Sequence, residues 1–264
     1  MYICCGVFPI FCLKDLAGYE GMSWKKSETR GPLILIAMKR TFLFLLTAVM
    51  LGFGLQSCEK EDNNGNDTTS VQWVDLGLPS GLLWADRNVG AASPEDYGNY
   101  YAWGETKLKK VYDWSTYAYG NANALTKYCN NPDQGLNGFT DNLTTLEASD
   151  DAATVNVGGK ARTPTKDDWQ ELMDNTIATW TTRNGVNGRL LTAPNGKSIF
   201  LPAAGFRYGS SLDDTGEVGY YWSSTLRTDD PGDAWGVYFG SSYQYVDVSG
   251  NRNYGTSVRA VRAK

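Results

Sequence analysis

A short apolar segment near the start of the chain limits which residues can belong to its fold. Lys39 and Arg40 follow Met38, and residues 41–54 form an almost uninterrupted apolar run. A run of this length after a basic start is too short for a comfortable transmembrane helix and is typical of a cleaved export signal. The sequence therefore predicts a signal peptide over residues 38–57, and the fold must be built from the residues after position 57.

The residues that close this segment resemble a lipoprotein processing motif. Leu55, Gln56 and Ser57 match the lipobox of bacterial lipoproteins and precede Cys58. The resemblance implies that Cys58 becomes the lipidated first residue of the mature chain and holds it at the outer membrane. The alternative is a plain signal peptide followed by a coincidental cysteine. Residues 1–37 are then expected to be a non-native upstream extension from a misplaced start codon.

A charged, polar stretch separates the predicted anchor from the first apolar pattern. Residues 58–70 contain "EKEDNNGNDTTS", which has no apolar periodicity. Such a composition buries too little apolar surface to fold, so we expect a disordered tether. Acidic residues directly after the lipidated cysteine also resemble the surface-export signal of Bacteroidetes lipoproteins, which implies exposure on the cell surface.

Composition excludes several kinds of chemistry. The chain has no histidine, which removes Ser-His-Asp triads, imidazole bases and His-ligated zinc. Cys129 is the one cysteine after Cys58, so the domain forms no internal disulfide and must rely on its core. After residue 57 the chain carries 18 Lys/Arg against 26 Asp/Glu, a net charge of −8, which would repel nucleic-acid phosphates. We therefore expect no nucleic-acid partner.

Short strands are predicted at both ends of the domain. Trp73 and Leu83 lie in apolar runs on either side of the turn "LPSG". Asn195-Gly196, between two apolar runs, predicts a β-hairpin. In the last predicted strand, Arg259 and Arg262 alternate with valines, and we expect them to form buried or half-buried ion pairs.

Two helices are predicted between these strands. Ser93 has the features of an N-cap before Pro94, which predicts a short helix. Thr165 caps a clearer helix, in which Trp169 and Leu172 repeat at helical spacing. Residues 107–159 are rich in turn-forming residues and are expected to form a long loop, which in a compact domain is either functional or an insertion.

Five segments in order resemble the Fibrobacter succinogenes major paralogous domain, which is common in lipoproteins of Bacteroidetes. They are "WVDLGLPSGLLWADRNVGAASPEDYGNYYAWGET", "RTPTKDDWQEL", "IFLPAAGFR", "YYWSST" and "VRAVR". The resemblance covers residues 71–264 and implies one α+β domain of C-type-lectin-like fold, with two helices, a small twisted antiparallel sheet and many ordered loops. The family is also similar to the formylglycine-generating enzymes, which share that fold.

The resemblance does not carry the enzyme activity with it. Formylglycine-generating enzymes hold copper with a pair of cysteines, and Cys129 here stands alone. We expect no catalytic residue and no required cofactor. Calcium is the alternative, because residues 130–134, "NNPDQ", and an acidic loop offer oxygen ligands, although both are equally typical of solvated turns. The acidic loop contributes Asp229, Asp230 and Asp233.

Residues 235–248, "WGVYFGSSYQYVDV", predict a hairpin with two different faces. The inward face is expected to support the fold through Trp235, Val237, Phe239, Val246 and Val248. The outward face, with one later tyrosine, is predicted to bind a ligand through Gly236, Tyr238, Gly240, Tyr243, Tyr245, Asp247 and Tyr254. This C-terminal segment also resembles the variable region of retroelement-diversified proteins, in which residues of these types change while the framework stays constant.

The sequence predicts a surface-anchored ligand-binding module whose partner is a protein or a glycan. Both a fixed and a diversified binding face fit the outward residues, which are of the types that antibody loops use. The rival hypothesis is a structural cell-surface or fimbria-associated subunit. A donor-strand subunit would need a long apolar edge segment, and the sequence contains none. A formylglycine-generating-type oxidase is the remote third hypothesis.

Overall fold

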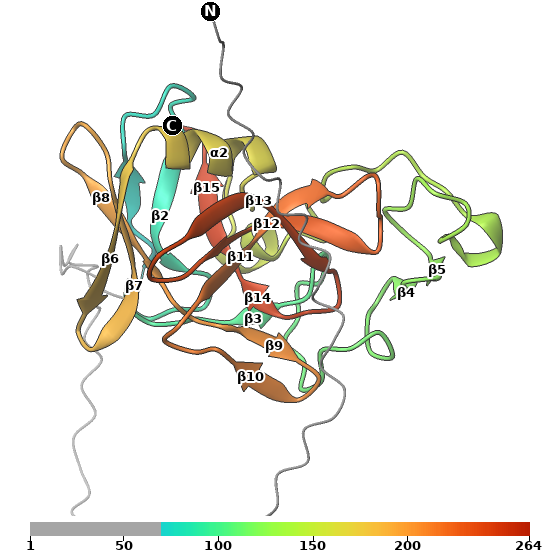
Figure 1. Cartoon of the computed structure of the whole chain (residues 1–264). Helices are drawn as coiled ribbons and strands as arrows, with labels where there is room; N and C mark the ends of the chain where they lie inside the picture. Colours follow the sequence, from blue (N-terminus) through green and yellow to red (C-terminus); the bar gives the residue numbers. More distant parts are fainter. Residues whose placement is uncertain (1–69) are drawn as a thin grey trace, which may run out of the picture. The chain divides into compact units, whose positions relative to one another are not determined.

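A computed structural model describes residues 70–264, and the predictions for residues 1–69, including the lipidated Cys58, lie outside this part (Figure 1). Strands and β-bridges take up 39% of the described residues and helices 9%. The strands form five small sheets, of five, three, three, two and two strands. The described part of the chain is therefore a β-rich fold.

The five-stranded sheet is built mainly from the C-terminal part of the chain, in the order β13-β12-β11-β14-β3. Successive strands β11, β12 and β13 pair antiparallel, whereas β14 runs parallel to β11. The bounds are β3 (Tyr100–Tyr101), β11 (Gly219–Leu226), β12 (Asp233–Phe239), β13 (Gln244–Asn251) and β14 (Thr256–Ser257).

The remaining sheets join distant parts of the described chain. In one, β1 (Trp73–Asp75), β2 (Leu83–Asn88) and β15 (Arg259–Arg262) bring its two ends together. Another is a meander closed by the predicted Asn195-Gly196 turn, which the structure confirms: β6 (Ile177–Arg183), β7 (Val186–Thr192) and β8 (Ser198–Pro202). The two-stranded sheets are β4 (Gly120–Asn121) with β5 (Ala124–Leu125), and β9 (Phe206–Tyr208) with β10 (Ser211–Asp213).

Helix α2 (Lys166–Asp174) begins where the sequence predicts it. The Thr165 hydroxyl accepts a hydrogen bond from the Asp168 amide at 3.1 Å, and the Asp168 carboxylate accepts one from the Thr165 amide at 2.7 Å. Helix α1 (Ala152–Val157) and a 3-10 turn (Leu136–Gly138) lie in the segment expected to be one long loop. No helix among the described residues is long and apolar enough to span a bilayer.

The expected fold class, α+β and C-type-lectin-like, is wrong. Part of the segment expected to be one long loop pairs as short strands instead, β4 with β5. The helix expected to begin at Ser93 does not form: residues 94–95 make only a turn, and Gly98 adopts a left-handed φ of +70° that a continuing helix would not allow. The structure is β-rich without a clear C-type-lectin-like arrangement.

Two apolar cores lie on opposite faces of the five-stranded sheet. Side chains alternate along β11, so Tyr220 and Trp222 belong to one core and Tyr221 to the other. On β12, Val237 and Phe239 join the core of Tyr221, which helix α2 covers. The face predicted to point outward is therefore covered by a second core along most of its length. It reaches solvent only at the turn end of the β12–β13 hairpin.

Arg259 lies fully buried on β15, without a carboxylate partner among the described residues. Its guanidinium donates hydrogen bonds of 2.7–3.1 Å to the Asn88 side-chain oxygen and to the carbonyl oxygens of Ala85 and Phe200. Burial lowers the pKa of this guanidinium. The predicted ion pairs in this strand are wrong, since neutral oxygens bind Arg259, and Arg262 lies over the Trp73 ring at 4.5 Å.

We expect Phe239→Ala to lower the free energy of unfolding by ~3–5 kcal/mol, because truncating a buried ring leaves a cavity. The Phe239 side chain is fully buried and stacks on Tyr221 with 5.9 Å between ring centroids. Tyr245→Ala on the same hairpin removes a ring that is 48% exposed, and should change this free energy by less than about 0.5 kcal/mol. Chemical denaturation measures both variants. Equal losses would contradict the assignment of the two faces.

Candidate binding surface

The hairpin of β12 and β13 is held in place by a buried arginine on a neighbouring sheet. The hairpin closes through a hydrogen bond of 3.0 Å from the Gly240 amide to the Tyr243 carbonyl oxygen. Arg189 on β7 donates to the carbonyl oxygens of Gly240 at 2.9 Å and Tyr243 at 2.8 Å. Burial lowers the pKa of Arg189, and these two carbonyl groups solvate its charge. The turn that carries Tyr243 is therefore fixed to the rest of the fold.

A continuous row of aromatic rings runs from the core to the tip of this hairpin. It starts at Trp222, whose ring lies 5.4 Å from that of Tyr220, and continues to Tyr238 at 5.7 Å. Tyr238 stacks on Tyr243 at 5.5 Å, and Tyr243 stacks on Tyr245 at 5.7 Å. We call Tyr220, Tyr238, Tyr243 and Tyr245 the tyrosine row. Its inner end is buried and its outer end, Tyr245, is exposed.

Glycines lie beside the tyrosine row because its rings need their space. A Cβ atom on Gly250 would lie 2.1 Å from the Tyr220 hydroxyl, and one on Gly236 would lie 2.6 Å from the Tyr221 carbonyl oxygen. On Gly240 it would lie 2.7 Å from the Tyr243 ring. These distances are far below ordinary contacts, so side chains at these positions would displace the rings or the backbone. Gly236 and Gly240 thus make room for the face and are not free to vary.

A β-bulge changes the predicted alternation in β13. Gly236 pairs with Val248 and Tyr238 pairs with Tyr245, which leaves two residues of β13 opposite one of β12. Val246 therefore packs against the core of Phe239, whereas Val248 packs against the core on the other face. The expectation that both valines share one face is wrong.

The structure brings most of the predicted site residues together. Tyr245 and Asp247 are exposed, and Tyr238 and Tyr243 are half-buried in the tyrosine row. The Tyr243 hydroxyl donates to that of Tyr238 at 3.4 Å, and burial raises the pKa of Tyr238. Tyr238 therefore stays protonated at physiological pH. The glycines, Gly236 and Gly240, are buried.

Tyr254, a predicted site residue, belongs to a neighbouring aromatic group whose other members were not predicted from the sequence. Its ring stacks on Phe206 at 6.0 Å and meets Tyr208 edge-on at 5.2 Å. Tyr208 is 55% exposed and Leu212, on the paired strand β10, is 37% exposed. The alternation in "FRYGSSLDD", residues 206–214, is the signal that would have indicated these residues. Phe206, Tyr238 and Tyr254 all pack against the core that contains Tyr220, so the two aromatic groups are neighbours.

The two loops considered for calcium meet in the structure. Asn130 donates to the Thr228 carbonyl oxygen at 2.9 Å, and Gln134 donates to the Asp230 carboxylate at 2.8 Å. The polar groups of the two loops, which are far apart in the sequence, thus bind each other directly. Direct contact between the loops accounts for their composition.

Arg227 pairs with two carboxylates of the acidic loop. Its guanidinium lies 2.9 Å from the Asp229 carboxylate and 3.4 Å from that of Asp233. Over residues 70–264, no three Asp, Glu, Cys or His side chains are arranged to hold a metal ion. The calcium alternative gains no support from this geometry.

The hairpin falls within the part of the chain that is similar to a known family. Residues 167–262, from α2 to β15, match the family model of a domain of unknown function, DUF8237. No curated protein and no solved structure matches the chain significantly. The family description assigns no activity.

Asp233 provides a test of this loop through pH. Burial raises the pKa of its carboxyl from 3.8, even though Ser249 and Arg227 bind it. The protonated form therefore suits the folded state better, and this stabilising contribution is complete below pH 3.8 and is lost as the pH rises through the folded pKa. We expect Asp233→Asn, which stays neutral, to raise the midpoint of thermal unfolding at pH 7 relative to wild type, with no difference near pH 3.

Asp229→Asn is the matched control for this experiment. The pKa of Asp229 is lowered by its hydrogen bond to Arg227, so its neutralisation should not raise the midpoint at pH 7. A lower midpoint for Asp233→Asn at pH 7 would contradict the buried, unfavourably charged state inferred for Asp233.

Proposed function

We propose that the described part of the chain is a ligand-binding module that uses the outer end of the tyrosine row as its contact surface. The observation that carries the proposal is the ordered, partly exposed stack of Tyr238, Tyr243 and Tyr245 on a turn fixed by Arg189. The fold does not need an exposed ring at Tyr245, whereas a partner would gain apolar contact area and hydroxyl groups from the row.

Preorganisation supports this proposal. Ordering a flexible side chain on binding costs about 0.5–1.5 kcal/mol for each side chain. Stacking and the fixed turn hold the rings of the row before any partner arrives, so much of this cost is already met in folding. Tyrosine is also well suited to such surfaces, because it offers a large rigid ring and a hydrogen-bonding group with few rotatable bonds.

The geometry of the row favours a protein partner over a glycan. Tyr243 lies between Tyr238 and Tyr245, with interplanar angles of 26° and 24°. At centroid distances of 5.5 and 5.7 Å these are offset stacks, so the row offers a mixture of ring surface and hydroxyl groups. Mixed apolar and hydrogen-bonding contacts of this kind suit the surface of a folded protein.

We further propose that the module acts outside the cell, tethered to the outer membrane by lipid on Cys58. The support is the export signal that the sequence predicts over residues 38–57 and the polar composition of the residues after it. A tether of this composition would let the binding surface reach partners beyond the membrane.

Alanine variants of the row should lose binding and keep their stability. We expect Tyr243→Ala and Tyr245→Ala each to weaken partner binding by ~2 kcal/mol or more, since truncated aromatic anchors dominate interface energetics. The wild-type chain is first screened against a panel of surface-protein extracts and a glycan array to find a partner. Binding to that partner and a melting curve are then measured for each variant. Ile177→Ala, which removes another exposed apolar side chain (74% exposed), is the control and should bind as wild type does.

The same screen decides between the classes of partner. Binding to proteins that both tyrosine variants lose would support the proposal in its favoured form. A glycan hit that Tyr245→Ala removes would replace the protein partner by a glycan. Partner binding that survives both tyrosine substitutions would rule out the tyrosine row as the contact surface.

The anchor has its own prediction. The chain recovered from the membrane fraction of the native host should begin at Cys58 and carry a lipid mass, because the residues before it match a lipoprotein signal. Intact-mass spectrometry of that fraction provides the check, with Cys58→Ser as the matched control that should abolish the added mass. A soluble chain that retains residues before position 58 would overturn the anchor.

A further inference from the structure

A second candidate site lies in a cavity of about 340 Å³ behind strand β9. The polar and aromatic residues that line it are Asn99, Tyr100, Lys109, Lys110, Tyr112 and Arg207, and none of the described residues that line it is Asp or Glu. Its size falls within the range of small-molecule pockets in proteins. All of its charged lining residues are basic, although the chain as a whole has a net charge of −5.

Two of its cations have no counterion. Lys109 forms an ion pair with Glu105 at 2.9 Å, with both side chains largely buried. The side chains of Arg207 and Lys110 have neither a carboxylate partner nor a hydrogen bond among residues 70–264. Lys109 is thus a neutralised part of the wall, and Arg207 and Lys110 contribute two uncompensated positive charges to the residues that line the cavity.

Packing fixes the Arg207 side of the cavity. The Arg207 guanidinium lies 5.0 Å from the centroid of the Tyr100 ring, an arrangement that orients its planar fork. Tyr100 donates its hydroxyl proton to the Ala204 carbonyl oxygen, and Tyr112 donates its own to the Tyr100 carbonyl oxygen, both at 2.6 Å. These hydroxyls are therefore committed to the fold and serve the cavity as rigid walls.

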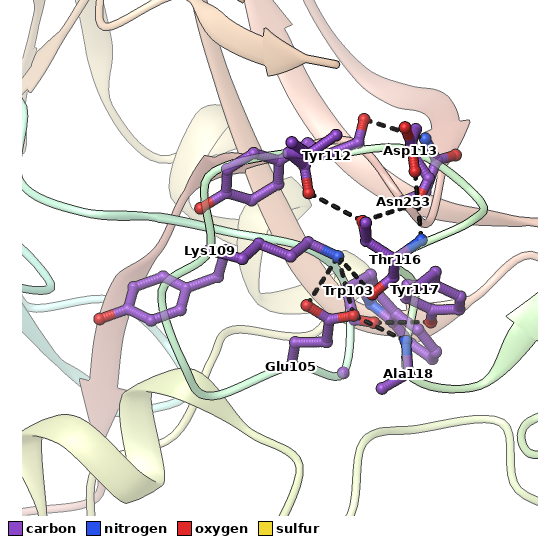
Figure 2. Close-up of polar contacts among 12 residues, drawn as sticks. Trp103, Glu105, Lys109, Tyr112, Asp113, Thr116, Tyr117, Ala118 and Asn253 are labelled. Atoms are coloured by element: carbon purple, nitrogen blue, oxygen red, sulfur yellow. Dashed lines mark hydrogen bonds and ion pairs between the residues drawn. The ribbon is translucent and has the colours of Figure 1, made fainter. Parts of the chain in front are cut away.

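The loop that carries Lys109 and Lys110 is also held in place by the fold. Figure 2 shows the Glu105 carboxylate between Lys109 and the backbone amide of Ala118, which donates to it at 2.8 Å. Thr116 donates its hydroxyl proton to the Val111 carbonyl oxygen at 2.8 Å and closes the same loop. The backbone that carries Lys110 is therefore held in place without a ligand.

We propose that this cavity binds an oxyanion: a carboxylate, sulfate or phosphate group carried on a small apolar or ring-shaped body. The guanidinium fork of Arg207 matches the oxygens of such a group in bidentate fashion, and Lys110 adds a second charge. Leu108, 57% exposed, lies at the same cavity and supplies an apolar contact for the body of the ligand. The basic run "KLKK", residues 107–110, is the sequence signal for this site.

This site is independent of the tyrosine row. Side chains alternate along β9, so Arg207 lies over Tyr100 while Phe206 and Tyr208 contact Tyr254 on the other face. The loss of one site need not affect the other. Failure of the oxyanion proposal therefore leaves the proposed function untouched, and the reverse also holds.

Ligand-observed NMR with the full chain tests the proposal, at constant ionic strength set with chloride. The probes are phenyl phosphate, phenyl sulfate, benzoate and inorganic phosphate, which separate the type of oxyanion from the contribution of the ring. We expect saturable binding of at least one of the aryl anions, and weaker binding of inorganic phosphate because it lacks a body to contact Leu108.

Substitutions locate the binding. Arg207→Gln should weaken binding of the best probe about tenfold, which is the loss of one charge-assisted hydrogen-bonding partner. Arg207→Lys, which keeps the charge and removes the fork, should weaken it less. Lys110→Gln should weaken binding several-fold. Because the Lys110 side chain is exposed, this variant should fold normally, so it tests the cavity even if Arg207→Gln does not fold. Lys197→Gln, the same charge change on an exposed turn, and Tyr245→Ala should leave it unchanged.

Two results would overturn the proposal. One is the absence of saturable binding for every probe. The other is an equal loss of binding in Lys197→Gln and Lys110→Gln, which would mean that the anions respond to overall charge and not to this cavity.

Discussion

Both the five-stranded sheet and its candidate binding surface depend on how the Tyr220 ring packs. The ring lies between Trp222 in the core and Tyr238 on the hairpin, and it fits only because Gly236 and Gly250 leave space beside it. Its hydroxyl is buried and has no hydrogen-bond partner among the described residues. Burying an unbonded hydroxyl costs ~1–3 kcal/mol, which the burial of a whole aromatic ring offsets. The tyrosine row thus starts from a rigid, apolar base.

Buried arginines connect the parts of this fold by donating hydrogen bonds to neutral oxygens. Arg252, fully buried, donates to the Tyr117 hydroxyl and to carbonyl oxygens of residues 127, 128 and 231, and so fixes the segment carrying β4 and β5 to the sheet. Arg189 fixes the hairpin turn in the same way. Removing such a partner would leave backbone carbonyl groups buried without donors, which is costly. Arg207 differs because its guanidinium has no hydrogen-bond acceptor among the described residues, and this contrast is the basis of the oxyanion proposal.

Local patterns in the sequence predict some of this structure and fail where distant contacts decide. The capping box at Thr165 and the Asn195-Gly196 turn depend on neighbouring residues, and both form as expected. The helix expected at Ser93 does not form, because Gly98 adopts a left-handed angle where it lies close to the Val89 carbonyl oxygen, a contact between neighbouring turns that the local pattern does not encode. The bulge opposite Val237 could not be foreseen either, since one extra residue changes which face Val248 occupies. The tyrosines of the candidate site can be predicted from the sequence, but burial of its glycines depends on ring positions that no local pattern encodes.

A photocrosslinking experiment tests the central claim, that the outer end of the tyrosine row touches a partner. A photoreactive phenylalanine analogue would replace Tyr245 in one chain and Ile177, which is also exposed, in another. After exposure to a partner-containing surface extract and to light, mass spectrometry would identify the adducts. We expect a discrete adduct at position 245 that is absent at position 177. Failure to form an adduct at position 245, or the same adduct at both positions, would contradict the claim.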